Sequence, residues 1–474
     1  MPLCFKIVSL TKKDEYHSKQ LSIRKMQFSK YAHFYDVGVE TIGVFHSLLI
    51  RTIFLTKNEK EAINLYLENK TSLNDDLKET VNYLFSNYYL VNSEAEDEEL
   101  YRQCVSLIYP PAISNAYIVV TENCNFNCKY CFISERVSAN AANKVMTKEV
   151  AKASVELLQR TYERQKHDYD KTITFYGGEP LLNLDIIKYF MQEVERMKSS
   201  AYWPADVKFA MITNGSLLNK ENIAFLRENN IALSISYDVD KHSHANRTSR
   251  LGQETFDVVR NNIQLCIDEK MPYSLSITIS ENTMRNCDAV LKEIMALKPL
   301  TIAFNMLIPN RHLIPSDTYY EDATNFMIEC FKRLRKNGIY EDRMMRKVQA
   351  FIDNKLYLYD CCASGGNQFV IAPDGSIGIC HGYLNNRKYF SANVMDKDFD
   401  FRNNSDFNYW KQRSPIFMPE CKDCECLGIC GGGCPYAADY IHGSIYALDE
   451  RFCIHAKRVL KWLVNDLYEQ IKID

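Results

Sequence analysis

Apolar runs alternate with amphipathic stretches through the middle of the chain. The stretches between the runs have helical periodicity, as in 147–164, where Thr147 stands as the N-cap. Successive strand–helix units predict an α/β fold: a parallel sheet curved into a partial (β/α)6 barrel of the TIM type, with its site at the carboxyl ends of the strands. The six runs expected to form strands are 116–121, 171–176, 207–213, 231–237, 273–279 and 300–308.

A different pattern precedes these units. Residues 31–37 and 41–56 predict short strands, and residues 57–70 and 73–91 predict two helices. The acidic run at 93–99 is expected to be a solvated spacer. Together these segments predict a small α+β domain that is separate from the barrel.

The chain is therefore expected to divide into four parts. The last part is rich in Cys, Gly and Pro, and its long loops could not build a large core alone, so metal clusters would supply the missing cross-links. The expected parts are an N-terminal α+β domain at 1–112, the barrel at 113–315, bridging helices at 316–360 and the Cys-rich domain at 361–474.

Charge and hydropathy restrict the setting in which this chain acts. Its 474 residues carry a formal net charge of -3, which gives no general attraction to nucleic acid or to an anionic membrane surface. No run of about 18 apolar residues exists, and the N-terminus becomes charged before a signal-peptide core is complete. We therefore expect a cytoplasmic protein with no nucleic-acid or membrane partner.

The 17 cysteines are unevenly distributed. In a reducing compartment they are more readily explained as metal ligands or buried apolar residues than as disulfides. Five are scattered and are expected to pack in cores: Cys4, Cys104, Cys266, Cys287 and Cys330. The other twelve form three groups: Cys124, Cys128 and Cys131; Cys361, Cys362 and Cys380; and Cys421, Cys424, Cys426, Cys430, Cys434 and Cys453.

The first group follows the first expected barrel strand, in "TENCNFNCKYCFIS". Three thiolates at the spacing C-x3-C-x2-C can hold three irons of a 4Fe-4S cluster and leave the fourth iron open to a small ligand. An open coordination position is typical of a catalytic site. A zinc site of three Cys and one His is the alternative, but no His lies within about thirty residues of the motif.

Polar or glycine-rich segments also follow the next three expected strands. "YGGEP" (176–180) brings Gly177 and Gly178, which permit close backbone approach, and Glu179, which presents a carboxylate or is a solvated acid in a tight turn. "TNGS" (213–216) and "SISYD" (234–238) follow the third strand and close the fourth. The carboxyl ends of parallel strands meet at one edge, so these segments predict a single site.

These motifs resemble the radical S-adenosylmethionine (SAM) superfamily, whose signature has an aromatic residue before its last cysteine, as Tyr130 stands before Cys131. The resemblance implies a catalytic 4Fe-4S cluster on Cys124, Cys128 and Cys131, which cleaves SAM reductively to a 5'-deoxyadenosyl radical that abstracts hydrogen from a substrate. It also implies a SAM site with contributions from Tyr130, Gly177, Gly178, Glu179, Asn214, Ser234, Ser236 and Arg247. The family commonly has Asp-Gly after the fourth strand, and this chain has Asp238 and Val239 there.

The C-terminal cysteines resemble the SPASM extension of radical SAM enzymes, which binds two auxiliary 4Fe-4S clusters. The spacing C-x2-C-x5-C-x3-C is followed by one further Cys, whereas a four-Cys zinc ribbon would leave three of these cysteines unused. The resemblance assigns Cys362, Cys380 and Cys434 to the first cluster, with Cys361, Cys426 or no protein group as its fourth ligand. It assigns Cys421, Cys424, Cys430 and Cys453 to the second.

SPASM enzymes mostly modify peptides or proteins. The resemblance therefore implies a maturase that installs an oxidative change in a ribosomally made precursor peptide, such as a thioether, ether or carbon-carbon cross-link. The leader segment of that precursor would bind the N-terminal domain by strand addition, although that domain could nearly as well be a structural cap. An external flavodoxin- or ferredoxin-type protein would supply single electrons.

Three alternatives remain open. Anaerobic sulfatase maturases, which make formylglycine, have an Asp after the cysteine that matches Cys380, where this chain has His381, a residue that can also act as a base. A small-molecule radical SAM enzyme would not need the N-terminal domain. A metal-binding module without catalysis would not cleave SAM.

Overall fold

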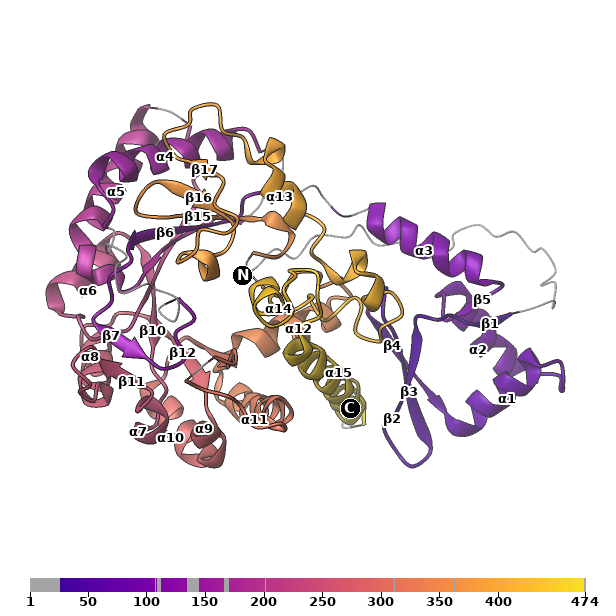
Figure 1. Ribbon diagram of the computed structural model, residues 1–474. Helices are drawn as coiled ribbons and strands as arrows, with labels where there is room; N and C mark the ends of the chain where they lie inside the picture. Colours follow the sequence, from indigo (N-terminus) through magenta and orange to yellow (C-terminus); the bar gives the residue numbers. More distant parts are fainter. Residues whose placement is uncertain are drawn as a thin grey trace.

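The computed structural model describes residues 26–106, 108, 112–133, 145–165, 170–200, 202–310, 312–361 and 363–472. A curved sheet covered by helices lies on one side of the molecule, and a small domain with a three-stranded sheet and helices lies on the other (Figure 1). Irregular segments of the C-terminal region lie between them. Cys362 falls outside the described residues.

Six parallel strands form the body of the large sheet and lie side by side in chain order, as the alternating pattern predicts. They are β6 (Asn115–Thr121), β8 (Thr172–Gly177), β9 (Lys208–Thr213), β10 (Ile231–Ser236), β12 (Tyr273–Ile279) and β13 (Thr301–Met306). The helices that connect or follow them are α4 (Lys148–Glu163), α5 (Leu184–Ser200), α6 (Lys220–Glu228), α7 (Lys241–His244), α8 (Phe256–Asp268), α9 (Glu281–Arg285), α10 (Cys287–Leu297) and α11 (Tyr319–Leu334). This arrangement is a partial TIM-like barrel of the α/β class.

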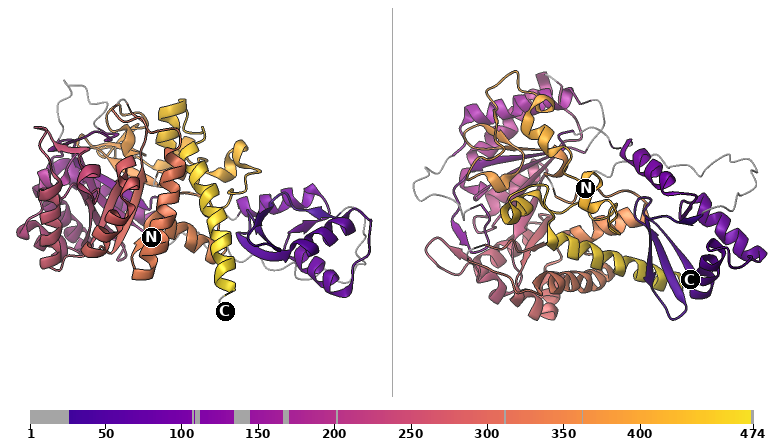
Figure 2. Two further views of the ribbon diagram at one scale, coloured as in Figure 1. Left: turned by 90° about the horizontal axis from the view of Figure 1, so that it is seen from below. Right: turned by 45° about the vertical axis from the view of Figure 1, so that its right-hand side comes forward.

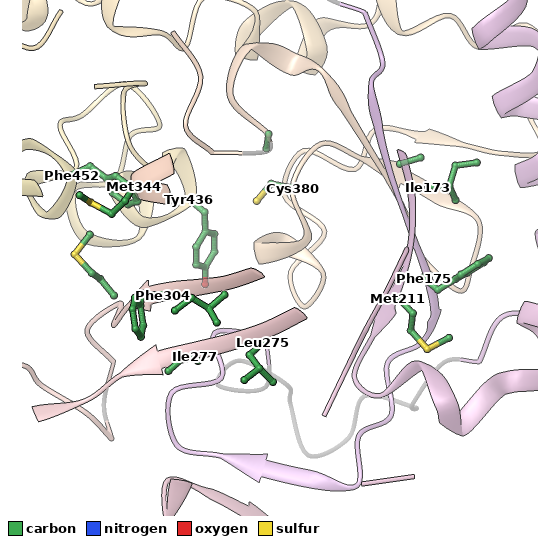
Figure 3. Close-up of a cluster of buried hydrophobic side chains, with 14 of the residues drawn as sticks. Ile173, Phe175, Met211, Leu275, Ile277, Phe304, Met344, Cys380, Tyr436 and Phe452 are labelled. Carbon is green, nitrogen blue, oxygen red and sulfur yellow. The ribbon is translucent and has the colours of Figure 1, made fainter. Parts of the chain in front are cut away.

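The two faces of this sheet differ in polarity. Side chains that point toward the helices are buried and apolar, and they include Ile173, Phe175 and Met211 on neighbouring strands (Figure 3). Ser234 and Ser236 of β10 and every second residue of β12 are instead polar and only half-buried. The strand register places Ser234 beside Ser274 and Ser236 beside Ser276. The concave face of the barrel is therefore a polar surface on which a hydrophilic ligand can lie.

The sheet extends at both edges beyond the six expected strands. β14 (Tyr340–Glu341) adds beside β13, before α12 (Asp342–Ile352). At the other edge β15 (Gln368–Ile371) pairs in parallel with β6, and β16 (Ser376–Gly378) and β17 (Ala392–Asn393) follow in antiparallel order. The Cys-rich region thus joins the barrel sheet through backbone hydrogen bonds.

The N-terminal domain contains an antiparallel sheet of β2 (Ala32–Asp36), β3 (Thr41–His46) and β4 (Arg51–Thr56). It has a core of its own, to which Val44, Ile63 and Leu84 contribute. Its other elements are β1 (Gln27–Phe28), α1 (Lys57–Leu67), α2 (Asp75–Ser86), β5 (Leu90–Val91) and α3 (Glu94–Ser106).

The acidic run at 93–99 is not a solvated spacer, because it forms the start of α3. Asp97, in the middle of the run, is fully buried and accepts hydrogen bonds from Ser29 Oγ at 2.5 Å and Lys30 N at 3.1 Å. The polar residues around Asp97 concealed the apolar side of this helix, formed by Leu100 and Cys104.

The long helix α15 (Glu450–Ile471) lies between the barrel and the N-terminal sheet (Figure 2). Tyr468 donates a hydrogen bond to Thr41 Oγ1 at 2.9 Å, and Val464 packs against Gly43 of β3. Tyr35 of β2 donates to Glu425 in the Cys-rich region at 2.6 Å. The N-terminal domain is thus attached to the C-terminal region.

Short elements form the rest of the Cys-rich region, and they include α13 (Ser405–Trp410), α14 (Pro435–His442) and a 3₁₀ helix at His381–Tyr383. Across the described ranges, no helix combines the length and the apolar character that crossing a membrane would require.

Candidate functional site

The first cysteine group lies on a loop that is held as a short ribbon. β7 (Phe126–Cys128) pairs in antiparallel fashion with β11 (Arg247–Ser249), and the register places Cys128 opposite Arg247. Backbone hydrogen bonds from Lys129 N to Asn246 O at 2.9 Å and from Arg250 N to Asn125 O at 3.0 Å continue the ribbon. The loop after β6 is thereby fixed to the segment that follows β10.

The three thiols of this loop lie close enough to interact electrostatically with one another. Burial raises the pKa of Cys124 to about 11 and that of Cys128 to about 12. Buried thiolates are therefore unfavourable here unless cations neutralise them. Three thiols on one loop fit an iron-sulfur cluster, whose irons supply the positive charge.

Gly177 and Gly178 bring the loop after β8 against the cysteine loop. A Cβ atom on Gly178 would overlap the backbone of Asn123, and one on Gly177 would overlap the carbonyl oxygen of Thr121. Gly178 N donates to Thr121 O at 2.9 Å, and Glu179 N donates to Asn123 O at 2.7 Å. The close approach for which the glycines are needed is thus to the backbone of the cysteine loop.

Glu179 is fully buried and is not a solvated acid. Its carboxylate accepts hydrogen bonds from Thr213 Oγ1 at 2.6 Å, Asn214 N at 2.7 Å and Leu181 N at 3.1 Å. Burial raises the pKa of this carboxyl, and these donors oppose the rise. The residue ties the end of β8 to the end of β9 beside the cysteine loop.

Asn214 connects the end of β9 to the cysteine loop. Its Nδ2 donates to Asn125 Oδ1 at 2.8 Å and lies 3.9 Å from Cys124 Sγ. Asn125 in turn donates to Ser216 Oγ at 2.9 Å. The ends of β6, β8 and β9 therefore meet around Cys124, as their expected positions at one edge require.

Tyr130, Asp238 and Arg247 form a buried polar cluster beside Cys128. The Tyr130 hydroxyl donates to Asp238 Oδ2 and accepts from Arg247 Nη1 at 2.8 Å, and Thr278 N donates to Asp238 Oδ1 at 2.9 Å. Burial raises the pKa of Asp238. Within the described chain, Arg247 Nε has no hydrogen-bond partner, so this donor can serve an anionic group such as a carboxylate.

The C-terminal cysteines separate into two sets. Cys361, Cys380 and Cys434 interact with one another, and Cys434 shares a hydrogen bond with Cys361. The second set is connected by electrostatic interactions and by a hydrogen bond between Cys424 and Cys426, and it comprises Cys421, Cys424, Cys426, Cys430 and Cys453. The described residues thus place Cys361 with the first set and Cys426 with the second.

The described cysteines do not form a single-ion site in this structure. Among the described residues, no three His, Cys, Asp or Glu side chains converge closely enough to hold one ion. A four-iron cluster binds one thiolate on each iron, so each set of three or more cysteines supplies the kind of ligands that such a cluster takes.

His381 connects the first C-terminal set to the mouth of the barrel. Its ring lies 4.9 Å from that of Tyr117, 5.0 Å from that of Tyr176 and 5.6 Å from that of Phe132, measured between centroids. Burial lowers the pKa of His381 to about 4. The imidazole is therefore neutral near pH 7 and sits between Cys380 and the cysteine loop.

Sequence reasoning predicted that Phe132 packs over the cluster of the cysteine loop, but it did not find Tyr117 and Tyr176, the other aromatic residues beside His381. Tyr117 lies within β6, Tyr176 lies near the end of β8, and Phe132 packs between His381 and Tyr436, at 5.8 Å from the latter. Tyr176 begins the "YGGEP" segment, and its position directly before the two glycines could have indicated a place at the site. Tyr117 carried no such signal, because it resembles any other strand residue.

Comparison with known proteins agrees with this geometry. Residues 118–294, from β6 to α10, match the family model of the Radical SAM superfamily. The chain therefore carries a radical SAM domain, and it is an enzyme of that class.

Two curated relatives extend beyond this domain. The radical SAM cyclopropyl synthase TigE of Paramaledivibacter caminithermalis is 23% identical over 491 residues, which cover 94% of this chain and 97% of that protein. The Cysteine-type anaerobic sulfatase-maturating enzyme of Clostridium novyi is 25% identical over 350 residues, which cover 70% of this chain and 87% of that protein. Both are named for maturation or biosynthetic reactions.

Two solved structures share the fold. The anSMEcpe structure with bound AdoMet superposes with a TM-score of 0.61 at 22% identity and covers 75% of this chain and 98% of that chain. Streptococcus suis SuiB, bound to its precursor peptide SuiA, has a TM-score of 0.51 at 15% identity and covers 90% of this chain and 99% of that chain. SuiB thus shares the fold over most of this chain.

Proposed function

We propose that this chain is a radical SAM peptide maturase that carries out an oxidative modification on a ribosomally made precursor peptide. The observation that carries the proposal is the contact of His381 with Phe132, because it joins the first C-terminal cysteine set to the SAM-cluster loop over the polar face of the barrel. A substrate on that face would lie between the residues that would hold two redox centres. Such an arrangement suits a reaction that removes electrons from the substrate after hydrogen abstraction.

The described residues fit three 4Fe-4S clusters. Cys124, Cys128 and Cys131 would hold the SAM-binding cluster. The first auxiliary cluster would use Cys361, Cys380 and Cys434, and Cys362 remains a proposed ligand outside the described residues. Cys421, Cys424, Cys430 and Cys453 would hold the second, while Cys426 forms its hydrogen bond to Cys424.

The bound clusters and SAM supply a 5'-deoxyadenosyl radical that abstracts a hydrogen atom from the substrate. The chain positions these groups. Arg247 Nε can donate to the SAM carboxylate, and Ser234 and Ser236 present hydroxyls on the concave face for its ribose. Gly177, Gly178, Glu179 and Asn214 hold the loops that enclose the site, and Tyr130 orients Arg247.

His381 is the proposed base. Its neutral imidazole faces the barrel mouth, and its Nδ1 has no hydrogen-bond partner among the described residues. It can accept the proton that an oxidised substrate radical releases. Phe132, Tyr117 and Tyr176 surround the ring with apolar surface and exclude water from it.

The relatives favour carbon-carbon bond formation among the oxidative reactions. TigE, named as a cyclopropyl synthase, aligns over nearly the full length of both chains, including the N-terminal domain. A formylglycine-forming reaction is the second candidate, because the clostridial sulfatase-maturating enzyme aligns over 70% of this chain. The first reaction removes a pair of hydrogens from the peptide, whereas the second replaces a side-chain sulfur by oxygen and creates an aldehyde.

The first experiment is analysis of iron, sulfide and 5'-deoxyadenosine in the anaerobically reconstituted protein. We expect about twelve irons in the parent and about eight in a Cys124/Cys128/Cys131→Ala variant, with the nucleoside formed only by the parent under reduction by flavodoxin or dithionite. Zinc in place of iron, or no SAM cleavage with either reductant, would contradict the proposal.

The substrate class is tested by mass spectrometry of peptides incubated with the active enzyme. Loss of a hydrogen pair from a precursor peptide supports the maturase reaction. An aldehyde trapped by a hydrazide reagent on a Cys-containing peptide supports the sulfatase-type reaction instead. Deletion of the N-terminal domain is unsuitable as a test for a small-molecule substrate, because Tyr31, Phe45 and Ile50 belong to the main core.

A further inference from the structure

Arg413 is a fully buried cation for which the proposed reaction has no use. It follows α13, where its N–H donates to Trp410 O at 3.0 Å. In the side chain, Nε donates to Ile445 O, Nη2 donates to Ala447 O at 3.3 Å, and Nη1 lies 2.9 Å from Met418 Sδ. All of these side-chain partners are electrically neutral.

No carboxylate in the described part of the chain forms an ion pair with this guanidinium. Asp449 lies within electrostatic range, but both of its oxygens are bound by Arg451 at 2.8 Å. Arginine does not lose its proton in proteins, and a buried charge without a partner costs several kcal/mol. The position of Arg413 therefore calls for negative charge nearby.

Three cysteines, from both auxiliary sets, interact with Arg413. It interacts electrostatically with Cys434 of the first set and with Cys421 and Cys430 of the second. The loop between Cys430 and Cys434 passes so close that a Cβ atom on Gly432 would lie 3.0 Å from Arg413 Nη1.

The remaining contacts tie Arg413 to the same cysteines along the chain. Met418 precedes Cys421 by three residues, and Ala447 lies in the segment that leads to Cys453. The guanidinium thus lies within electrostatic range of cysteines from both sets.

We propose that Arg413 is the shared counter-charge of the two auxiliary clusters and raises the reduction potential of both. A cubane held by thiolates carries net negative charge, and reduction adds one further electron. A fixed positive charge nearby stabilises the reduced form more than the oxidised form, and burial protects this interaction from screening by salt. The inference rests on the proposed function for the presence of the clusters.

This role favours the oxidative chemistry proposed above. An electron leaves a substrate radical more readily when the accepting cluster has a higher potential. Because one cation faces both sets, removal of its charge should move both potentials in the same direction. A role limited to folding would not alter the potential of those clusters that still assemble.

The test is an anaerobic redox titration, followed by electron paramagnetic resonance, of the full chain carrying the Cys124/Cys128/Cys131→Ala changes, which leave only the auxiliary signals. Arg413→Lys keeps the charge, Arg413→Met removes it, and Arg413→Gln removes it while keeping an amide donor for the Ile445 or Ala447 carbonyl. Arg335→Met is the matched control, because Arg335 pairs with Asp466 at 2.6 and 2.9 Å, away from the cysteines. Auxiliary iron is counted before each titration.

We expect both midpoints to become more negative in the Met and Gln variants and to stay unchanged in the Lys variant and the control. Loss of auxiliary iron in both neutral variants but not in Arg413→Lys also supports the proposal, because it shows that the charge is required. Unchanged midpoints in the neutral variants, a shift of one cluster alone, or loss of iron in the Lys variant would overturn it. A parent that never binds auxiliary iron would instead refute the proposed cofactors, and the iron count reveals this outcome first.

Discussion

Gly177 and Gly178 carry no side chains, and backbone of the cysteine loop fills the space that their Cβ atoms would take. Gly177 also has a φ of +153°, which side-chain-bearing residues rarely adopt. The atoms that these Cβ atoms would meet belong to the backbone and not to flexible side chains that could move aside. These positions therefore tolerate no substitution that keeps the loop in place.

Gly178→Ala should abolish the SAM cluster and leave the auxiliary clusters intact. The new methyl group would displace the backbone of Asn123, and Cys124 would move with it. Iron analysis should show a fall from about twelve to about eight atoms, with no 5'-deoxyadenosine. Gly252→Ala is the control, because nothing lies within 4 Å of its Cβ position. At a φ of +78° this change should lower the free energy of unfolding by about 1 kcal/mol and leave the iron content unchanged. Full iron content in Gly178→Ala would disprove this account of the loop.

His46, in the N-terminal domain, should make the protein sensitive to acid. Its Nδ1 accepts hydrogen bonds from Leu48 N at 3.3 Å and Leu49 N at 3.2 Å, and burial lowers the pKa of this residue to about 3. The folded state therefore excludes a proton that the unfolded chain binds below about pH 6.5. This contribution to stability is present above that pH and is lost as the pH falls toward 3.

The corresponding prediction compares the parent with His46→Asn, whose amide oxygen can accept from the same N–H groups without titrating. Between pH 7 and pH 5 the parent should lose about 2 kcal/mol of unfolding free energy that the variant retains. Urea unfolding at both pH values measures the difference. Equal pH dependence in the two proteins would show that His46 does not titrate as its surroundings imply.

At the scale of elements, the β7–β11 ribbon determines where the cysteines stand. Cys128 lies in a strand of three residues whose partner strand begins at Arg247, more than a hundred residues later in the chain. The resemblance to a known family gave Arg247 a ligand-binding role. The structure adds that its backbone also braces the cysteine loop.

The long barrel strands could be predicted from the sequence, and their short additions could not. The strand expected at 116–121 is β6 (Asn115–Thr121), and the strand expected at 300–308 is β13 (Thr301–Met306). Each strand is long enough for its apolar residues to be distinguished from the polar residues on either side. β14 and β17 have two residues each and show no periodicity, so only their distant partners define them.

The candidate site likewise has a part that could be predicted from the sequence and a part that could not. Cysteine spacing grouped the candidate metal ligands, because thiols on one loop must lie close together. The surroundings of His381 come from β6, β8, the cysteine loop and α14, and only the fold brings Tyr117 and Tyr436 into one cluster. Likewise, the two hydrogen bonds that Glu179 accepts from Thr213 and Asn214 depend on the end of another strand and could not be predicted from "GGEP".

Strand addition of a leader peptide to the N-terminal domain requires an edge strand, and β2 is one edge of its three-stranded sheet. Hydrogen bonds from Ser47 N to Tyr31 O and from Val37 N to Thr41 O show that odd-numbered residues of this segment face β3. The backbone N–H groups of Phe34 and Asp36 therefore point to the outer edge, where an added strand would bind.

Asp36→Pro should weaken peptide binding without disturbing the sheet. It removes one outward donor and leaves the β2–β3 hydrogen bonds in place, so affinity should fall about tenfold for peptides selected on the parent by mRNA display. Asp36→Asn keeps the N–H and is the control. Equal binding by the Pro and Asn variants would rule out strand addition at this edge.

At the scale of the whole molecule, α15 joins parts that lie far apart in the sequence. One side of it packs on α11 beside the barrel, and the other side contacts β3 of the N-terminal domain. Gly43 of β3 leaves room for Val464, since a Cβ atom there would lie 2.5 Å from Val464 Cγ1. The N-terminal domain should therefore unfold together with the C-terminal helix.

Gly43→Ala should destabilise the protein by about 1–3 kcal/mol through overpacking against α15. Val464→Ala removes the methyl group that opposes the new side chain. It should therefore lower the free energy of unfolding less in the Gly43→Ala background than in the parent. Urea unfolding of the two single variants and the double variant measures this coupling. Strict additivity would mean that the domain and the helix are not packed as one unit.

The pairing of β15 with β6 bears on the order in which the protein is assembled. β6 leads directly into the SAM-cluster loop, yet its outer edge is completed only by residues 368–371, about 250 positions later in translation. Until those residues leave the ribosome, the nascent barrel exposes an apolar strand with unpaired backbone groups, a surface prone to aggregation. Iron-sulfur loading should therefore follow release of the finished chain, and growth conditions that slow synthesis and supply iron late should increase the yield of active enzyme.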